Sequence, residues 1–351
     1  MDVQLMALWE GYHIYWLLYC ITISVVRQSS VVRAVNTKCD CVVFEETFGK
    51  EFGVFTSPNW PVPYVDNINC LLYSFLAERD QIVEITFDEF DVQKTSLDCE
   101  YGDFIKLFLH LDEPGVNEKT SWNSILCGKI ADIEQTHYSS HSNLVFEFRS
   151  DWRNGNNTGF RGTYRFLNKQ MFHTDGELIP KSKCDYKFES TATINGTARS
   201  RGRFYSPQYP STYPKNIECS YIFVGQSNER VKLTLESIRL LKTDLSCINS
   251  PDLILIHDGN DTSAPVIGQL CNINSYVELV STGPVLYVQF LSRSHTPGQG
   301  FKGKFTFDTI GNSANTVVVD IPSTGKSAAP VVQSITDPNV ALCCIAIAFN
   351  Y

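Results

Sequence analysis

Hydrophobic and polar residues alternate along several short segments of the chain with a period of two. In one of them, Val83, Ile85 and Phe87 alternate with charged or polar positions. The clearest segments of this kind are residues 83–88, 231–236 and 286–290. A period of two predicts strands with one buried and one wet face. Clusters of Pro, Gly and Asn separate these segments, and no comparable amphipathic helix occurs, so the pattern predicts an all-β fold of the sandwich type.

These segments belong to an internal repeat. Residues 57–61 read S-P-N-W-P and residues 206–210 read S-P-Q-Y-P. Further matches follow in the same order: Tyr64, Asn67 and Cys70 with Tyr213, Asn216 and Cys219; residues 103–105 with 252–254; Cys99 and Cys127 with Cys247 and Cys271; residues 144–148 with 286–290; residues 159–162 with 300–303. A conserved order at a nearly constant offset indicates two homologous modules. We expect them at residues 39–167 and 184–308, joined by a polar linker at 168–183.

Both ends of the chain differ from the modules. Residues 14–26 are apolar and too short to span a bilayer, and Val32-Arg33-Ala34 follows. This arrangement predicts a signal peptide over residues 1–34, and a short buried helix is the alternative. Residues 309–351 predict a disordered stalk, whose apolar end carries Cys343 and Cys344. That end fits a glycolipid-anchor signal, a truncated membrane helix or a soluble terminus, so a membrane tether stays open.

Composition narrows the class of protein. The chain has 351 residues, 43% of them hydrophobic and 19% charged, which suits a packed core and excludes wholesale disorder. The net charge of -9 argues against a nucleic-acid partner, because phosphates require clustered Lys and Arg. Twelve cysteines beside three methionines indicate an oxidising compartment. We therefore expect a secreted or cell-surface protein.

No catalytic motif is apparent. His137 and His141 stand four residues apart, but Tyr138 occupies the place where a zinc protease motif has glutamate. Nucleophile-elbow, P-loop and dinucleotide motifs do not occur in the sequence. We predict a non-enzymatic protein. Three sequons predict glycosylation at Asn156, Asn195 and Asn260, each in a stretch rich in Gly, Asn or Asp.

Four cysteines per repeat, the S-P-x-aromatic-P turn and the closing G-F-x-G strand together resemble the CUB-domain family. The resemblance covers both repeats and implies two compact, antiparallel, jelly-roll-like β-sandwiches in tandem. It implies the disulfides Cys99–Cys127, Cys184–Cys219 and Cys247–Cys271. Both Cys39 and Cys41 precede Cys70; we take Cys41 as the bridged residue, and the choice between them stays open. The cysteine left over suggests pairing elsewhere or with a partner.

The family resemblance also implies a calcium site in many such modules, built from carboxylates near the third cysteine and in a late loop. In the first module the matching residues are Gln93, Asp103 and Asp151, where Gln93 replaces a glutamate. We expect calcium as a cofactor of the first module only, because carboxylate oxygens are its preferred ligands and the second module has Leu241 and Arg293 instead. The alternative is that the two aspartates only solvate a loop end.

The loop after residue 150 carries an acid, an aromatic and a base, namely Asp151, Trp152 and Arg153. This composition predicts a contact site for a protein partner. Alternatively, Trp152 folds back to plug the sandwich. A sugar on Asn156 would crowd this loop.

The tandem layout and the Cys-Asp-Cys opening are similar to those of invertebrate suppressor-of-lurcher proteins and of neuropilin- and tolloid-like receptor auxiliaries. This resemblance implies an extracellular protein-binding role, as an auxiliary or regulator of a cell-surface receptor such as an ionotropic glutamate receptor. Two alternatives remain: a secreted carrier or matrix protein that assembles through the odd cysteine, and a recruiting subunit for a separate protease.

Overall fold

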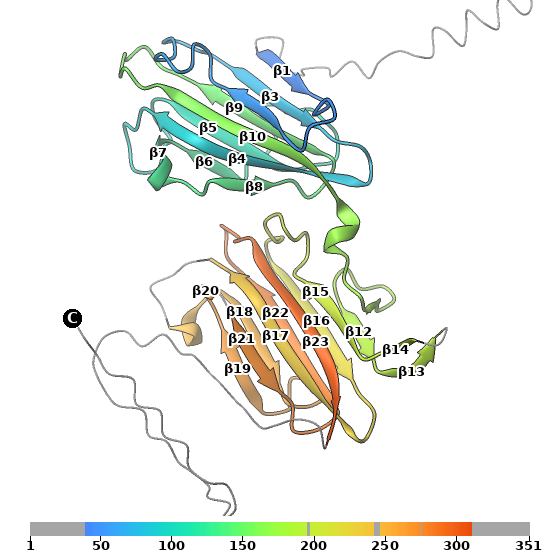
Figure 1. Ribbon diagram of the computed structural model, residues 1–351. Helices are drawn as coiled ribbons and strands as arrows, with labels where there is room; N and C mark the ends of the chain where they lie inside the picture. Colours follow the sequence, from blue (N-terminus) through green and yellow to red (C-terminus); the bar gives the residue numbers. More distant parts are fainter. Residues whose placement is uncertain (1–38, 195–196, 242–245, 275, 311–351) are drawn as a thin grey trace, which may run out of the picture. The chain divides into compact units, whose positions relative to one another are not determined.

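The computed structural model describes residues 39–310 except 195–196, 242–245 and 275 (Figure 1). The predicted signal peptide, the predicted stalk beyond residue 310, and Cys343 and Cys344 lie outside the described residues. Within that part of the chain, no helix is long and apolar enough to cross a membrane. Its helices are the short 3-10 turns η1 (Ile130–Asp132), η2 (Lys169–Phe172) and η3 (Cys247–Asn249). The all-β prediction is confirmed.

The first module consists of two sheets. The first has the strand order β1-β3-β9-β5-β6, and the second has the order β2-β10-β4-β7, with β8 also paired to β4. The strands are β1 (Asp40–Phe44), β2 (Gly53–Thr56), β3 (Leu71–Leu76), β4 (Gln81–Val92), β5 (Phe104–Leu111), β6 (Ser124–Leu126), β7 (Gly128–Lys129), β8 (Thr136–Tyr138), β9 (Asn143–Arg149) and β10 (Gly159–Asn168).

The second module repeats this topology. Its sheets have the orders β11-β12-β16-β22-β18-β19 and β15-β23-β17-β20, with β21 paired to β17. The strands are β11 (Glu177–Leu178), β12 (Tyr186–Glu189), β13 (Thr191–Ile194), β14 (Thr197–Arg199), β15 (Arg201–Tyr205), β16 (Ile217–Val224), β17 (Glu229–Arg239), β18 (Asp252–His257), β19 (Val266–Leu270), β20 (Ile273–Asn274), β21 (Val277–Val280), β22 (Val285–Ser292) and β23 (Gly300–Thr309). Apart from β11 and the β13–β14 hairpin, each strand has a counterpart in the first module, which confirms the repeat.

Two details differ from the sequence prediction. The first strand of each sandwich is parallel to its neighbour, since β1 pairs with β3 and β12 with β16 in parallel registers, whereas the other pairs are antiparallel. The expected linker at residues 168–183 includes two short regular elements. It contains η2 and β11, and β11 adds an antiparallel strand to the edge of the second module.

Aromatic side chains fill both cores. Val83, Ile85 and Phe87 on β4 are fully buried, as their alternation predicted. In the first core the ring centroids of Tyr73 and Phe146 stack 4.5 Å apart, and Phe188 and Phe223 do the same in the second. Offset and edge-to-face ring pairs of this kind add to the stabilisation from burial.

The two sequence motifs of each repeat meet in space. In the first module the Ser57 hydroxyl accepts a hydrogen bond from the Phe160 N–H at 3.0 Å. Gly159 has φ +84°, and a Cβ there would lie 2.0 Å from Ser57 Oγ. Ser206 and Gly300 repeat this contact in the second module. The G-F-x-G strand therefore begins with glycine because both the backbone conformation and the close serine exclude a side chain.

Four disulfides close the modules: Cys39–Cys70, Cys99–Cys127, Cys184–Cys219 and Cys247–Cys271. Our assignment of Cys41 to the first bridge was wrong. The parallel register places Asp40 beside Leu71, so Cys39 falls beside Cys70, with 4.7 Å between their Cα atoms, whereas Cys41 lies beside Leu72. Cys41 is a free, exposed thiol.

Candidate functional site

Three strand ends of the first module bring the predicted calcium ligands to one region. Gln93 follows β4, Asp103 precedes β5, and Asp151 follows β9. The Asp151 N–H donates to Asp103 Oδ1 at 2.7 Å, so these two residues are adjacent. Tyr64, from the loop after β2, joins Asp103 to Gln93: its hydroxyl donates to Asp103 Oδ2 at 2.5 Å and accepts from the Gln93 N–H at 3.1 Å.

Asp103 is the buried centre of this arrangement, with 2% of its surface exposed. Burial raises the pKa of its carboxyl above the usual range, and the nearby carboxylates of Asp151 and Asp66 raise it further. The hydrogen bonds from Tyr64 and Asp151 act in the opposite direction, because they stabilise the charged form. A positive charge placed here would relieve the repulsion among the three carboxylates.

Gln93 has one unusual atom. Among the described residues, its buried Oε1 has no hydrogen-bond partner. A buried carbonyl oxygen without a donor is costly, so such an atom indicates a missing partner. A cation would supply one, since amide oxygens are ligands for Ca²⁺.

The loop after β9 exposes Trp152, which is 72% accessible. The Arg153 guanidinium lies 5.4 Å from the Trp152 ring centroid and 3.5 Å from Asp151 Oδ2, and the Arg153 N–H donates to Asp151 Oδ1 at 2.7 Å. The acid, the aromatic and the base therefore lie together on this loop; that they form a partner-contact site stays a prediction. The alternative in which Trp152 plugs the sandwich is excluded by its exposure.

Sequence reasoning missed Asp66. The negative charge of its carboxylate helps to raise the pKa of Asp103. The N–H of the adjacent Asn67 donates a hydrogen bond to the Asp151 carbonyl at 2.8 Å. The internal repeat could have pointed to Asp66, because the corresponding residue of the second module, Lys215, has the opposite charge. We call Asp66, Asp103 and Asp151 the acidic triplet.

The second module inverts this charge. Arg293 and Lys215 occupy the positions of Asp151 and Asp66, and Leu241 that of Gln93. The remaining acid, Asp252, is completely buried and internally satisfied. It accepts hydrogen bonds from the Tyr213 hydroxyl (2.6 Å), the Arg293 N–H (2.9 Å), and the N–H (3.0 Å) and hydroxyl of Ser294. In the second module, hydrogen-bond donors of the protein therefore stabilise the buried carboxylate, as a cation could in the first.

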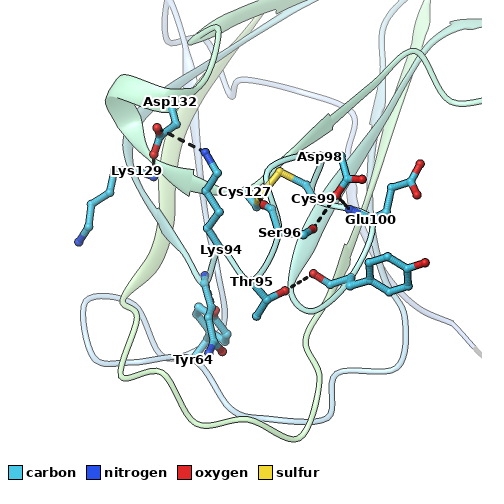
Figure 2. The surroundings of a disulfide bond; sticks show 12 residues. Tyr64, Lys94, Thr95, Ser96, Asp98, Cys99, Glu100, Cys127, Lys129 and Asp132 are labelled. Atoms are coloured by element: carbon cyan, nitrogen blue, oxygen red, sulfur yellow. Dashed lines mark hydrogen bonds and ion pairs between the residues drawn. A yellow bond between two sulfur atoms is a disulfide. The ribbon is translucent and has the colours of Figure 1, made fainter.

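The loop between Gln93 and Asp103 is tied down by a disulfide. Figure 2 shows the Cys99–Cys127 bridge, which joins this loop to the residue just before β7. Lys94 reaches Asp132 at 3.6 Å, and Ser96 donates to Asp98 at 2.6 Å. Within the described ranges, no group of three or more His, Cys, Asp or Glu side chains has metal-site geometry. A calcium ion would therefore also need amide or backbone carbonyl oxygens.

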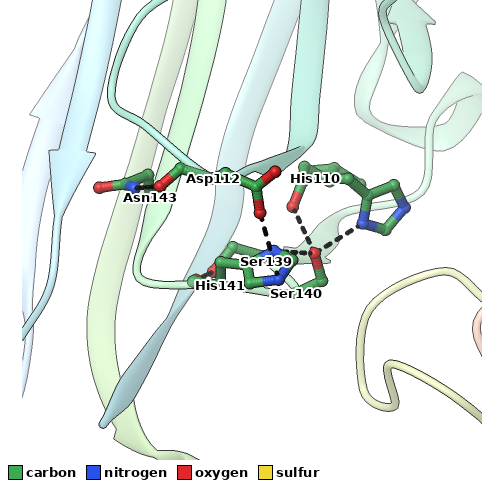
Figure 3. A network of polar contacts seen from close by, with 7 residues as sticks. His110, Asp112, Ser139, Ser140, His141 and Asn143 are labelled. Carbon is green, nitrogen blue, oxygen red and sulfur yellow. Dashed lines mark hydrogen bonds and ion pairs between the residues drawn. The ribbon is translucent and has the colours of Figure 1, made fainter. Parts of the chain in front are cut away.

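His137 and His141 do not belong to any group of three or more potential metal ligands among the described residues. His137 lies buried on β8, where burial lowers its pKa to about 4. His141 belongs to a separate polar network with Ser140 and Asp112, which Figure 3 shows. Its Nδ1 lies 2.9 Å from Ser140 Oγ, and its Nε2 lies 3.6 Å from a carboxylate whose side chain is 91% exposed. Ser140 is itself buried and also bonds to His110, so its hydroxyl faces protein groups.

Two of the three sequons have exposed asparagines. Asn156 lies in the loop before β10, and Asn260 lies between β18 and β19. Asn195 lies outside the described residues. Glycosylation of these sites stays a prediction.

Comparison with known proteins identifies the modules. The family model for the CUB domain matches residues 43–164 and 193–305. Tolloid-like protein 2 of Mus musculus is 24% identical over 277 residues, covering 71% of this chain and 25% of that protein. Cubilin of Sus scrofa is 24% identical over 286 residues, covering 81% of this chain and 7% of that protein. The chain thus spans only a small part of these relatives.

Among solved structures, the matches superpose on the whole chain with low scores. The CUB1-EGF-CUB2 domains of rat MASP-1 match with a TM-score of 0.31 and 22% identity, covering 76% of this chain and 99% of that one. The MASP-1 CUB2 domain bound to Ca²⁺ matches with a TM-score of 0.27 and 25% identity, covering 35% of this chain and 96% of that one.

The family match covers most of both sandwiches. The matched regions are non-catalytic binding modules, and CUB domains mediate protein interactions outside the cell. The chain belongs to the CUB-domain family, as a tandem pair of these extracellular protein-interaction modules.

Proposed function

We propose that this chain binds a cell-surface receptor through its first CUB module and regulates it as an auxiliary protein. The observation that carries the proposal is the exposed Trp152 beside the acidic triplet. Exposed aromatics next to charged groups are typical binding hot spots. The corresponding surface of the second module has Ser294 in place of the tryptophan and two basic residues in place of two acids.

The acidic triplet suits a basic side chain of the partner. Asp151 keeps 23% of its side chain accessible, and it already holds one guanidinium, that of Arg153, at 3.5 Å. A Lys or Arg from the partner could replace or join Arg153 in a charge-assisted pair. Trp152 would then pack against the aliphatic part of that side chain.

Calcium is part of this proposal. Gln93, Asp103 and Asp151 would hold the ion in the first module, with Asp66 adding negative charge nearby. The buried Gln93 Oε1 without a partner supports this assignment. The ion would fix the loops that present Trp152, so calcium and partner binding would be linked.

An ionotropic glutamate receptor is the partner we propose, because the Cys-Asp-Cys opening and the tandem layout resemble receptor auxiliaries. A carrier or matrix role would require no receptor, and a protease-recruiting role would require a catalytic chain. The three functions therefore predict different partners for the first module: a receptor, no receptor, or a separate protease chain.

Co-expression of the full chain with an ionotropic glutamate receptor tests the proposal. Agonist-evoked current and co-precipitation should both change with the wild-type chain, and Trp152→Ala should weaken co-precipitation by about ten-fold or more, the range of a hot-spot loss. Tyr276→Ala is the matched control, since Tyr276 is also an exposed aromatic (56%) but lies on the second module. Equal loss in both variants would contradict the assignment to the first module. Absence of any current change or co-precipitation would reject the receptor role.

A further inference from the structure

The first strand of the first module is an open sheet edge. On its inner side β1 pairs with β3, and the Asp40 N–H donates to the Cys70 carbonyl at 3.1 Å. Because N–H and C=O groups alternate along a strand, those of Cys41 and Val43 point away from β3. Within the described residues no strand pairs with that outer side. Val42 and Val43 are 39% and 42% exposed.

The second module covers the equivalent edge. Its strand β12 corresponds to β1, and there β11 pairs with Tyr186 and Lys187. Tyr186 corresponds to Val42, since Val42 pairs with Tyr73 and Tyr186 with the equivalent Tyr221. The same chain thus has two copies of one edge, and the described part of the chain covers only one of them. An unpaired edge with apolar side chains is a template for strand addition.

The open edge also carries the unpaired thiol. Eight of the nine described cysteines form four disulfides, and Cys41 alone is free. A second unpartnered group lies beside it: Ser74 is 2% exposed, and its Oγ has no hydrogen-bond partner in the described part of the chain. Cys41 and Ser74 line one small hollow together with Leu72 and Val116. In the described part of the chain, the edge therefore has no strand on its outer side, and the Ser74 hydroxyl beside it has no hydrogen-bond partner.

We propose that β1 pairs antiparallel with β1 of a second copy of this chain, and that a Cys41–Cys41 disulfide locks the pair. Residues that exchange both backbone hydrogen bonds in an antiparallel pair have Cα atoms ~5.5 Å apart, within the ~4.4–6.8 Å span of disulfides. Pairing Cys41 with its own copy places Asp40 opposite Val42 of the second copy. No two carboxylates then face each other, so the edge is self-complementary, as a two-fold interface requires.

The covalent step is a thiol–disulfide exchange. Two Cys41 thiols lose two protons and two electrons and form one S–S bond, while a small-molecule or protein disulfide is reduced to two thiols. This is the class of oxidant that forms the other four bridges. Although Cys41 is exposed, partial burial raises the pKa of its thiol, which lowers its thiolate fraction and slows the exchange. Strand pairing would offset this by holding the two thiols together.

The test uses the full secreted chain in two differently tagged forms, co-expressed and captured through one tag. We expect co-capture, a dimer on non-reducing gels, and a Cys41–Cys41 peptide in the mass spectrum of the unreduced protein. Cys41→Ser should be secreted and should abolish the covalent dimer. Val43→Lys keeps the thiol but places a charge on the open edge, and it should reduce dimer formation. Leu97→Lys is the matched control, because Leu97 is 94% exposed and lies in the loop between β4 and β5.

Several results would overturn the proposal. One is a wild-type chain that is monomeric with an alkylatable Cys41. Another is a Cys41 bridge to Cys343, Cys344 or a different protein. A covalent dimer unaffected by Val43→Lys would remove the role of the strand edge. Receptor binding through Trp152 is measured separately, so either idea can fail alone.

Discussion

The buried histidine of the first module should make its stability depend on pH. His137 is 8% exposed, lies opposite Ile85 in the β4–β8 pair, and packs its ring 6.2 Å from that of Phe87. Burial lowers its pKa to about 4, although a hydrogen bond to the Glu134 backbone partly counteracts this. An unfolded histidine has a pKa of ~6.5. The unfolded state therefore binds the proton first as the pH falls.

The size of the effect follows from these two values. The stability that His137 contributes is fully present above about pH 6.5 and is lost as the pH falls toward about 4. Between roughly pH 7 and pH 4.5, one such group should remove about 2 kcal/mol from the free energy of unfolding. His137→Gln keeps a polar group that can donate to the Glu134 carbonyl but does not titrate, so it should flatten the profile by this amount.

Tryptophan fluorescence reports on the first module in a secreted chain from which the predicted signal peptide, with Trp9 and Trp16, has been removed. Trp60, Trp122 and Trp152 all lie in residues 39–167, and residues 184–308 contain no tryptophan. Urea unfolding of wild type and His137→Gln at several pH values gives the two profiles. His141→Gln is the control, because the His141 side chain is 42% exposed and should leave the profile nearly unchanged. Parallel profiles for wild type and His137→Gln would refute the reasoning.

Three further outcomes follow from the site and the fold. Removal of a bridge typically costs ~2–5 kcal/mol, so Cys219→Ser should prevent secretion, and normal export would contradict its role. Millimolar calcium should raise the melting temperature of the first module, detected by tryptophan fluorescence. Asp151→Ala should remove that rise, and Gln93→Glu should enlarge it. Identical melting with calcium and with chelator would exclude the ion. Gly300→Ala should destabilise the second module by ~1–3 kcal/mol in calorimetry, because φ is +99° and a Cβ would meet Ser206, whereas Gly283→Ala, with open space around it, should change little.

The strands and the core residues could be predicted from the sequence, because apolar residues that alternate with a period of two lie on the buried face of a strand. Residues 83–88, 231–236 and 286–290 all lie in β-strands whose apolar positions face the core. Three of the four disulfides were also predicted correctly. The fourth was wrong because it depends on strand register: a shift of two residues decides whether Cys39 or Cys41 faces Cys70, and counting residues carries no information about register.

The candidate site could be predicted from the sequence only in part. Asp103 and Asp151 were predicted from their motif positions, but Asp66 belongs to a turn whose contact with Asp151 arises only when β2, β5 and β9 come together. The exposure of Trp152 could not be read from sequence either, because large aromatics occur both in cores and on binding surfaces. The strand β11 was missed because two residues are too few to show periodicity.

The strand order has a consequence for how the chain is made. In the first module β10, the last strand, lies between β2 and β4 and pairs with both, and β23 does the same between β15 and β17. During synthesis, neither of these two sheets can close before its last strand, which has ten residues, has been made. A nascent chain that stops before residue 159 leaves β2 without a partner strand and leaves β4 paired only with β7 and β8. Chaperone binding during synthesis should therefore end in two steps, one for each closing strand, with the first module complete before the second begins to close.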